Sequence, residues 1–156
     1  MTINRVVVDK SAERGFRLRA LRKMPLEYIE ALIGYVQDGV AHVCLFIPFE
    51  HTATSRYIYY DEDAYEDCND EAKEHHLVHI GSVHSHPRCK DAMFSEEDLA
   101  DSSGDTRDLI MGVCAIEVRH KAGKTRRRCR IAYWPGVPPL KVDYTDWAKK
   151  KKRRAA

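Results

Sequence analysis

The sequence lacks any long hydrophobic run. No apolar stretch approaches the roughly 18 residues that a membrane-spanning helix needs, so we predict no contact with a membrane. The first ten residues contain neither the apolar core nor the small-residue cleavage site of a secretion signal. These absences predict a protein of the cytoplasm.

Cysteine pairs at metal-binding spacing are also missing. The chain has five cysteines, an odd number, and none of them forms a Cys-x-x-Cys motif. This usage favours a reducing compartment over a disulfide framework. Cys44 and Cys114 lie in apolar runs and are expected in the core, whereas Cys68, Cys89 and Cys129 lie in polar segments and are expected to be accessible.

The residues that are present predict a globular protein. A chain of 156 residues suits one domain, and 44% hydrophobic with 32% charged residues fits a core with a well-hydrated surface. The net charge of +2 hides a run of six basic residues at 149–154, without which 20 basic and 24 acidic residues remain. We therefore predict one domain over residues 1–148 and a basic, disordered tail over residues 149–156.

Hydrophobic periodicity predicts a mixture of strands and helices, hence an α+β fold (α/β in looser usage). Ser11 is expected to cap the first helix, which runs to about Met24. The expected strands are 3–8, 28–36, 40–49, 78–86, 109–118, 126–134 and 140–142, and a second helix is expected over 61–76.

The stretch GSVHSHPRCKDAMFSEED, residues 81–98, carries the main candidate site. Side chains alternate along a strand, so His84 and His86 face the same side, and Pro87 ends the strand. Ser95 is expected to cap a following helix, which places Asp98 on the same side of its first turn. Two imidazoles and one carboxylate are a set of three protein ligands that a catalytic zinc can use.

Three other histidines are weaker candidates as ligands. The same alternation places His79 on the opposite face from His84, where packing or contact with solvent is expected. His75 and His76 end a charged helix, where cations suit the negative end of the helix dipole. We therefore expect the metal site to exclude these three side chains.

The pattern His-Ser-His-Pro, seven residues, Ser-x-x-Asp resembles the signature of the JAMM (MPN+) zinc metallopeptidases, which include the deubiquitinase of the proteasome lid and prokaryotic relatives. The resemblance implies one zinc ion on His84, His86 and Asp98, and a role for Ser95 in stabilising the transition state. It also implies an MPN/JAB (cytidine deaminase-like) architecture with a mixed, mainly antiparallel sheet flanked by helices. The His-x-Glu and Pro-Cys-x-x-Cys signature of the zinc deaminases themselves is absent.

The same family uses a distant glutamate as general base, usually within Pro-x-Glu-x-x-Gly-x-Leu-x-Gly. The chain matches this pattern at Pro25, Glu27, Leu32 and Gly34 and departs from it at Glu30, where glycine is usual. Glu27 and Glu30 face opposite sides of an extended strand, so only one of them can reach the metal. The register with Pro25 and Gly34 favours Glu27.

These side chains suit the hydrolysis of an amide, with Glu27 moving the proton and Ser95 donating a hydrogen bond to the oxyanion. The resemblance implies cleavage after the C-terminus of a ubiquitin-like protein, by deconjugation or precursor processing. The partners would be that protein or its conjugates, together with E1/E2-like enzymes of the same system. Alternative substrates are peptidoglycan or phage-tail peptides and small-molecule amides.

Two further hypotheses lie outside enzymes. A non-catalytic scaffold of the same fold usually loses the metal residues, and all of them are present here. A nucleic-acid-binding protein acting through Arg126, Arg127, Arg128 and the basic tail is less favoured, because such clusters commonly protect exposed sheet edges from aggregation.

Overall fold

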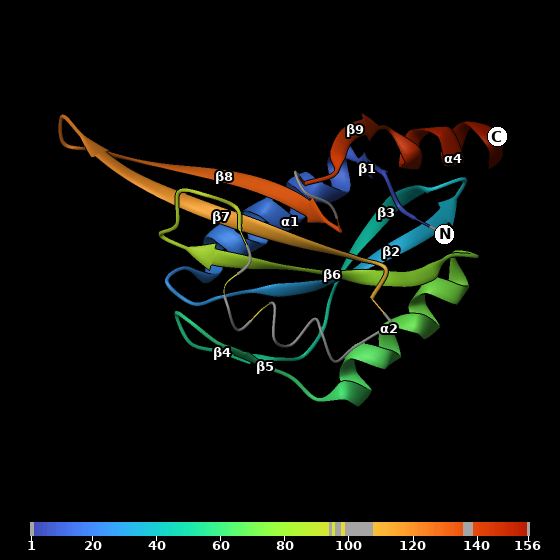
Figure 1. Cartoon of the computed structure of the whole chain (residues 1–156), viewed down its shortest axis with the longest axis horizontal. Coiled ribbons are helices and arrows are strands. Elements are labelled where there is room, and N and C mark those ends of the chain that lie inside the picture. Colours follow the sequence, from blue (N-terminus) through green and yellow to red (C-terminus); the bar gives the residue numbers. More distant parts are fainter. Residues whose placement is uncertain (1, 94, 96–97, 99–107, 136–138, 156) are drawn as a thin grey trace.

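A seven-stranded sheet organises the protein (Figure 1). The structure, a computed structural model, describes residues 2–93, 95, 98, 108–135 and 139–155. In spatial order the strands are β8 (Lys124–Trp134), β7 (Ile110–Lys121), β6 (Val78–Pro87), β2 (Ile29–Gln37), β3 (Val40–Pro48), β1 (Arg5–Asp9) and β9 (Lys141–Thr145). A separate small hairpin pairs β4 (Thr52–Ala53) with β5 (Ile58–Tyr59).

The strands pair in both directions. β1 runs parallel to β3 and β9, and β6 runs parallel to β7. β2 is antiparallel to β3 and β6, and β7 is antiparallel to β8. The sheet is therefore mixed, as expected. Its described ladders are three parallel and three antiparallel, so the expectation of a mainly antiparallel sheet holds for the length of the ladders but not for their number.

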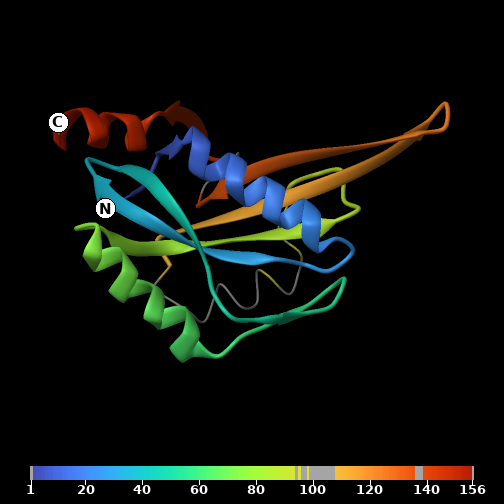
Figure 2. The same cartoon turned by 180° about the vertical axis from the view of Figure 1, so that it is seen from behind.

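Helices pack on both faces of this sheet. On one face, which Figure 2 shows from behind, α1 (Lys10–Lys23) buries Phe16 and Ala20 in the larger core. On the other face, α2 (Glu62–Glu74) buries Tyr65, Cys68 and Ala72 against β2 and β3. No helix among the described residues combines the length and the apolar character that crossing a membrane requires.

The first helix starts earlier than expected. The side chain of Asp9 accepts a hydrogen bond from the backbone N of Ala12 at 2.9 Å, so Asp9 is the N-cap. Ser11, the expected cap, is the second residue of the helix. Aspartate and serine serve equally well in this role, and the sequence pattern alone does not rank them.

A β-bulge at Ile80 decides which histidines of β6 share a face. Two consecutive residues of β2 pair with Gly81 and His79, so Ile80 is an extra residue in β6. The extra residue reverses the alternation, and the ring of His79 lies 4.3 Å from that of Tyr65, between centroids, on the α2 face. The prediction that His79 and His84 face opposite sides is therefore wrong, whereas the packing role of His79 is confirmed.

Burial of the cysteines is partly as expected. Cys44 and Cys114 are buried, Cys89 is exposed and Cys129 is half-buried. Cys68, expected to be accessible, is buried under α2, because the acidic residues around it occupy the outer side of that helix. All five thiols are free.

The basic C-terminal residues lie in a helix. α4 (Trp147–Ala155) contains residues 149–155 of the predicted tail. Trp147 packs against the core on the α2 face, and the ammonium group of Lys151 lies 5.0 Å from the centroid of its ring. A packed residue therefore anchors the start of this helix, and the domain boundary at residue 148 stays a prediction.

β7 and β8 form a long hairpin that projects beyond the rest of the sheet (Figures 1 and 2). Its ladder is unbroken from Met111 paired with Trp134 to Lys121 paired with Lys124. Ala122 and Gly123 close the turn with φ of 53° and 72°. The expected turn around Gly123 is therefore present.

Candidate metal centre

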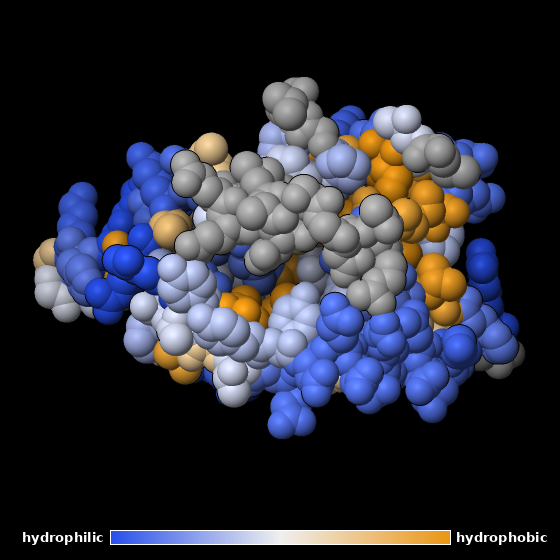
Figure 3. Space-filling view, turned by 60° about the horizontal axis from the view of Figure 1, so that its bottom comes forward, coloured by the Kyte–Doolittle hydropathy of each residue, from blue (hydrophilic) through white to orange (hydrophobic). Residues whose placement is uncertain are grey.

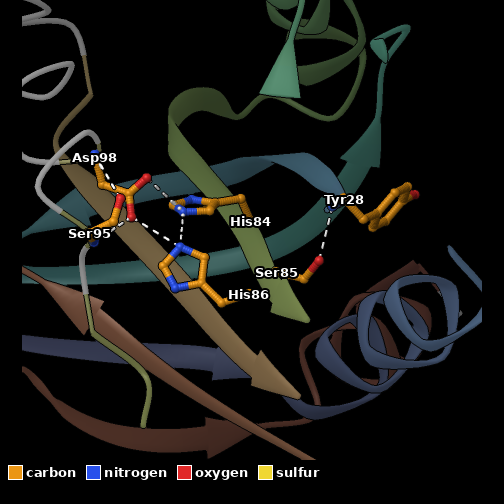
Figure 4. Close-up of polar contacts among 6 residues, drawn as sticks. All are labelled: Tyr28, His84, Ser85, His86, Ser95 and Asp98. Atoms are coloured by element: carbon orange, nitrogen blue, oxygen red, sulfur yellow. Dashed lines mark hydrogen bonds and ion pairs between the residues drawn. The ribbon is translucent and has the colours of Figure 1, made fainter. Parts of the chain in front are cut away.

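Two imidazoles project from the same face of β6 (Figure 4). The Nε2 atoms of His84 and His86 lie 3.0 Å apart, and the ring centroids 4.8 Å apart. His84 is buried and His86 is half-buried. The strand thus holds two nitrogen ligands toward one point, as its alternation predicts.

Ser85, between the two histidines, points to the opposite face and holds the strand in register. Its Oγ accepts a hydrogen bond from the backbone N of Tyr28 at 2.9 Å, and its backbone N donates to the carbonyl O of Tyr28 at 2.8 Å. These bonds tie β6 to the residues that lead into β2 (Figure 4). The position of the strand that carries the imidazoles is therefore fixed from behind the site.

Asp98 reaches the imidazoles from the segment that follows β6. Its Oδ1 lies 3.1 Å from Nε2 of His84, and its Oδ2 lies 3.0 Å from Nε2 of His86. Ser95 and Asp98 exchange two hydrogen bonds, from Ser95 N to Oδ2 at 2.8 Å and from Asp98 N to Ser95 Oγ at 3.1 Å. This is a capping box with aspartate in place of glutamate, which confirms the predicted cap. The rest of the helix predicted after Ser95 lies outside the described residues.

The three side chains fit a small divalent cation. One ligand atom from each, two nitrogens and a carboxylate oxygen, lies within 4.8 Å of the others. The shortest separations are 3.0–3.1 Å, while ligands bound at 2.0–2.1 Å to a tetrahedral ion lie about 3.3 Å apart. A small increase in the distances between the three ligand atoms therefore makes room for an ion. Imidazole and carboxylate ligands suit several first-row divalent metals, so the donor set defines a site for that class.

The charge of Asp98 suits this position. Partial burial raises the pKa of its carboxyl group, but hydrogen bonds from His84 and His86 outweigh that effect and hold the pKa well below its usual range. Asp98 is therefore an anion at neutral pH, as a metal-binding carboxylate must be.

The structure separates the two candidate glutamates, beginning with Glu30. Its side chain is fully buried on the α1 face, where Arg19 donates from Nε and Nη2 to its two carboxylate oxygens at 2.6 and 2.8 Å. The hydroxyl of Tyr28 donates to the same carboxylate. Both oxygens of Glu30 are occupied, and the side chain faces away from His84 and His86.

Glu27 lies on the other side of the sheet, just before β2. Ile29 pairs with His84 in an antiparallel ladder, so continuing that register by two residues places Glu27 beside His86 and on the imidazole face. Its backbone N donates to the carbonyl O of Thr54 at 2.8 Å, and its side chain is half-buried. Register therefore brings Glu27, and not Glu30, to the face of the triad.

Tyr28 and Arg19, which hold the carboxylate of Glu30, were not candidates from the sequence. Tyr28 and Glu30 are two residues apart at the start of a strand, so alternation alone indicates that they share a face. The approach of Arg19 has no such signal, because it depends on how α1 crosses the sheet.

Replacing Arg19 by alanine should lower the free energy of unfolding by about 2–3 kcal/mol, because the buried carboxylate of Glu30 loses its cationic partner. The loss is smaller than for a wholly buried pair, since the side chain of Arg19 is 37% exposed. Urea denaturation followed by circular dichroism measures the change. Arg22→Ala, at an exposed position of the same helix, is the control and should change stability by less than about 0.5 kcal/mol. Equal losses in the two variants would contradict the role of Arg19.

Comparison with known proteins identifies similar sequences and folds. The profile of prokaryotic homologs of the JAB domain matches residues 9–149. The solution structure of a protein from Desulfitobacterium hafniense is similar, with a TM-score of 0.63 and 16% sequence identity over 90% of this chain and 93% of that chain. At that identity the likeness concerns the fold alone. No curated protein matches the chain.

Proposed function

The chain belongs to the family of prokaryotic homologs of the JAB domain, and on that basis we propose that it is a zinc-dependent peptidase. The observation that carries the proposal is the convergence of His84, His86 and Asp98 at one point of the sheet. The register that brings Glu27 to the same face supplies a candidate base. The MPN (cytidine deaminase-like) architecture is part of this proposal.

Each residue has a defined task in the proposed reaction. His84 and His86, through their imidazole nitrogens, and Asp98, through its carboxylate, would hold the ion. A bound zinc ion would supply Lewis-acid chemistry, which polarises a scissile carbonyl and lowers the pKa of water at the site to about 7. Glu27 accepts the proton of the attacking water and transfers it to the leaving nitrogen.

Ser95 stabilises the negative charge that develops on the carbonyl oxygen. Its Oγ accepts a hydrogen bond from the backbone N of Asp98 at 3.1 Å, which leaves the hydroxyl proton for donation. A donor that is already oriented in this way costs little to reorganise during the reaction. The same contact therefore positions both a ligand and an oxyanion donor.

The proposed substrate is the peptide or isopeptide bond after the C-terminus of a ubiquitin-like protein, cut in the cytoplasm. Resemblance of the two motifs to the JAMM signature supports this choice, because a site that hydrolyses amides does not by itself select which amide is bound. The proposed partners are the ubiquitin-like protein, its conjugates and E1/E2-like enzymes of the same system.

The test incubates the zinc-loaded protein with linear fusions and isopeptide conjugates of candidate ubiquitin-like proteins, with and without a chelator. Mass spectrometry should find the modifier released with its intact C-terminus, and the chelator should stop the release until zinc is added back. Hydrolysis of a peptidoglycan stem peptide, with neither modifier cut, would overturn the substrate and leave the metallopeptidase. No chelator-sensitive cleavage of any of these amides would overturn the proposed function.

A further inference from the structure

The sheet face that carries the imidazoles continues onto the projecting hairpin. His86 pairs with Ala115 of β7, and Ala115 pairs with Arg130 of β8. Paired residues of neighbouring strands share a face. Arg130 therefore lies on the metal face, two strands from His86, which is about 10 Å at the usual strand spacing.

From Arg130 outward, this face of β8 is basic at every second residue. Arg130, Arg128, Arg126 and Lys124, here called the basic stripe, are all exposed. At about 6.8 Å for two residues, the stripe is about 20 Å long. The projecting end of the hairpin, at the left in Figure 3, carries hydrophilic side chains.

The neighbouring strand leaves this positive charge largely uncompensated. Opposite the stripe on β7 lie Arg119 and Lys121, together with Glu117, the one acidic residue of residues 117–130. The carboxylate of Glu117 accepts a hydrogen bond from Nε of Arg119 at 2.7 Å. Of the seven lysines and arginines of residues 117–130, six lie on this face with the single carboxylate. The metal face of the hairpin therefore has a strong positive potential.

The basic residues favour one face of the strand. β8 is the outer strand of the sheet, and charges at an outer strand also protect it from aggregation. That protection does not require the charges to lie on one face. On the opposite face of the same segment, Arg127 is basic but Thr125, Cys129 and Ile131 are not.

We propose that the basic stripe is an exosite that binds an acidic segment of the protein whose amide is cut at the metal centre. The inference rests on the proposed function, because the bound protein is taken to be the substrate. A protein is favoured over a nucleic acid because the stripe shares its face with side chains suited to amide chemistry. Charges at two-residue spacing also match the carboxylates along one side of an extended polypeptide.

The test measures binding separately from cleavage. A fluorescent peptide with glutamate at every second position, and its glutamine counterpart, are titrated with the full-length zinc-loaded protein, and the anisotropy is recorded. The glutamate peptide should bind at least about tenfold more tightly than the glutamine peptide, and its binding should weaken between about 50 and 300 mM salt. It should also persist after chelation, because the stripe does not use the metal.

Variants at exposed positions locate the binding. Neutralising the basic stripe by Lys124→Gln, Arg126→Gln, Arg128→Gln and Arg130→Gln together should weaken binding at least about tenfold. Arg128→Gln alone should weaken it about two- to threefold. Arg127→Gln, on the opposite face, should change it less than twofold. A quadruple variant of α4 with the same change in charge, Lys149→Gln, Lys152→Gln, Arg153→Gln and Arg154→Gln, should change it less than about threefold.

Several results would overturn the exosite. An equal loss in the stripe and α4 variants means that only total charge matters. If neutralising the stripe weakens binding of an oligothymidylate of the same charge more than binding of the glutamate peptide, the surface binds nucleic acid instead. A dimer that dissociates when the stripe is neutralised, seen by sedimentation, points to the acidic α2 of a second copy. Because the peptide need not be cut, failure of this binding is distinguishable from failure of amide hydrolysis.

Discussion

Replacing His84 and His86 together by alanine should abolish metal binding and lower amide hydrolysis by at least about 10³-fold. In the candidate site the two imidazoles would supply two of the three ligands, and Asp98 alone would not hold an ion. Metal analysis of the purified wild-type protein should give about one zinc per chain, and the double variant should contain almost none.

His79→Ala is the matched control for the double variant. His79 belongs to the same strand and the same face, but its ring packs on Tyr65 instead of joining the triad. The His79 variant should therefore keep its zinc. Full metal content in the His84, His86 double variant, or loss of metal in the His79 variant alone, would show that the site is assigned to the wrong side chains.

Glu27→Gln should lower turnover by about 10²–10⁴-fold, because the amide cannot accept the proton of the attacking water. Zinc content should stay unchanged, because residue 27 is not among the proposed ligands. Glu30→Gln should keep activity within a fewfold of the wild type. It should instead lose stability, since Arg19 and Tyr28 then face a neutral group in the core. Single-turnover rates, zinc content and urea denaturation of both variants separate the two outcomes. Loss of turnover in the Glu30 variant with activity kept in the Glu27 variant would transfer the role of base to Glu30.

The two halves of the triad follow from the sequence because each depends on short-range geometry. His84 and His86 lie beyond the bulge, where the strand alternates regularly. Ser95 and Asp98 are linked by a cap that spans three residues. Both patterns are set by the backbone within a few residues, so neither needs knowledge of the surrounding fold.

The predictions that fail depend on contacts made elsewhere. The face of His79 is reversed by Ile80, whose extra place in β6 is set by pairing with β2. The neighbouring Gly81 is the local sign of such a bulge, and the prediction from simple alternation did not use it. Cys68 has acidic neighbours on both sides in the chain, yet its side of α2 packs on the sheet. Alternation places Glu30 on the face opposite Glu27, but the charge that stabilises it comes from Arg19 on another element.

β7 joins the metal centre and the hairpin tip in one uninterrupted strand. Val113 and Ala115 pair with His84 and His86, and Lys121 ends the same strand at the tip. A displacement of the hairpin by a bound acidic segment would therefore reach the part of β7 that pairs with both histidines. If such binding changes the affinity of the triad for an ion, then the ion changes the affinity of the basic stripe for the acidic segment by the same factor. Metal content and partner occupancy are then two readings of a single coupling energy.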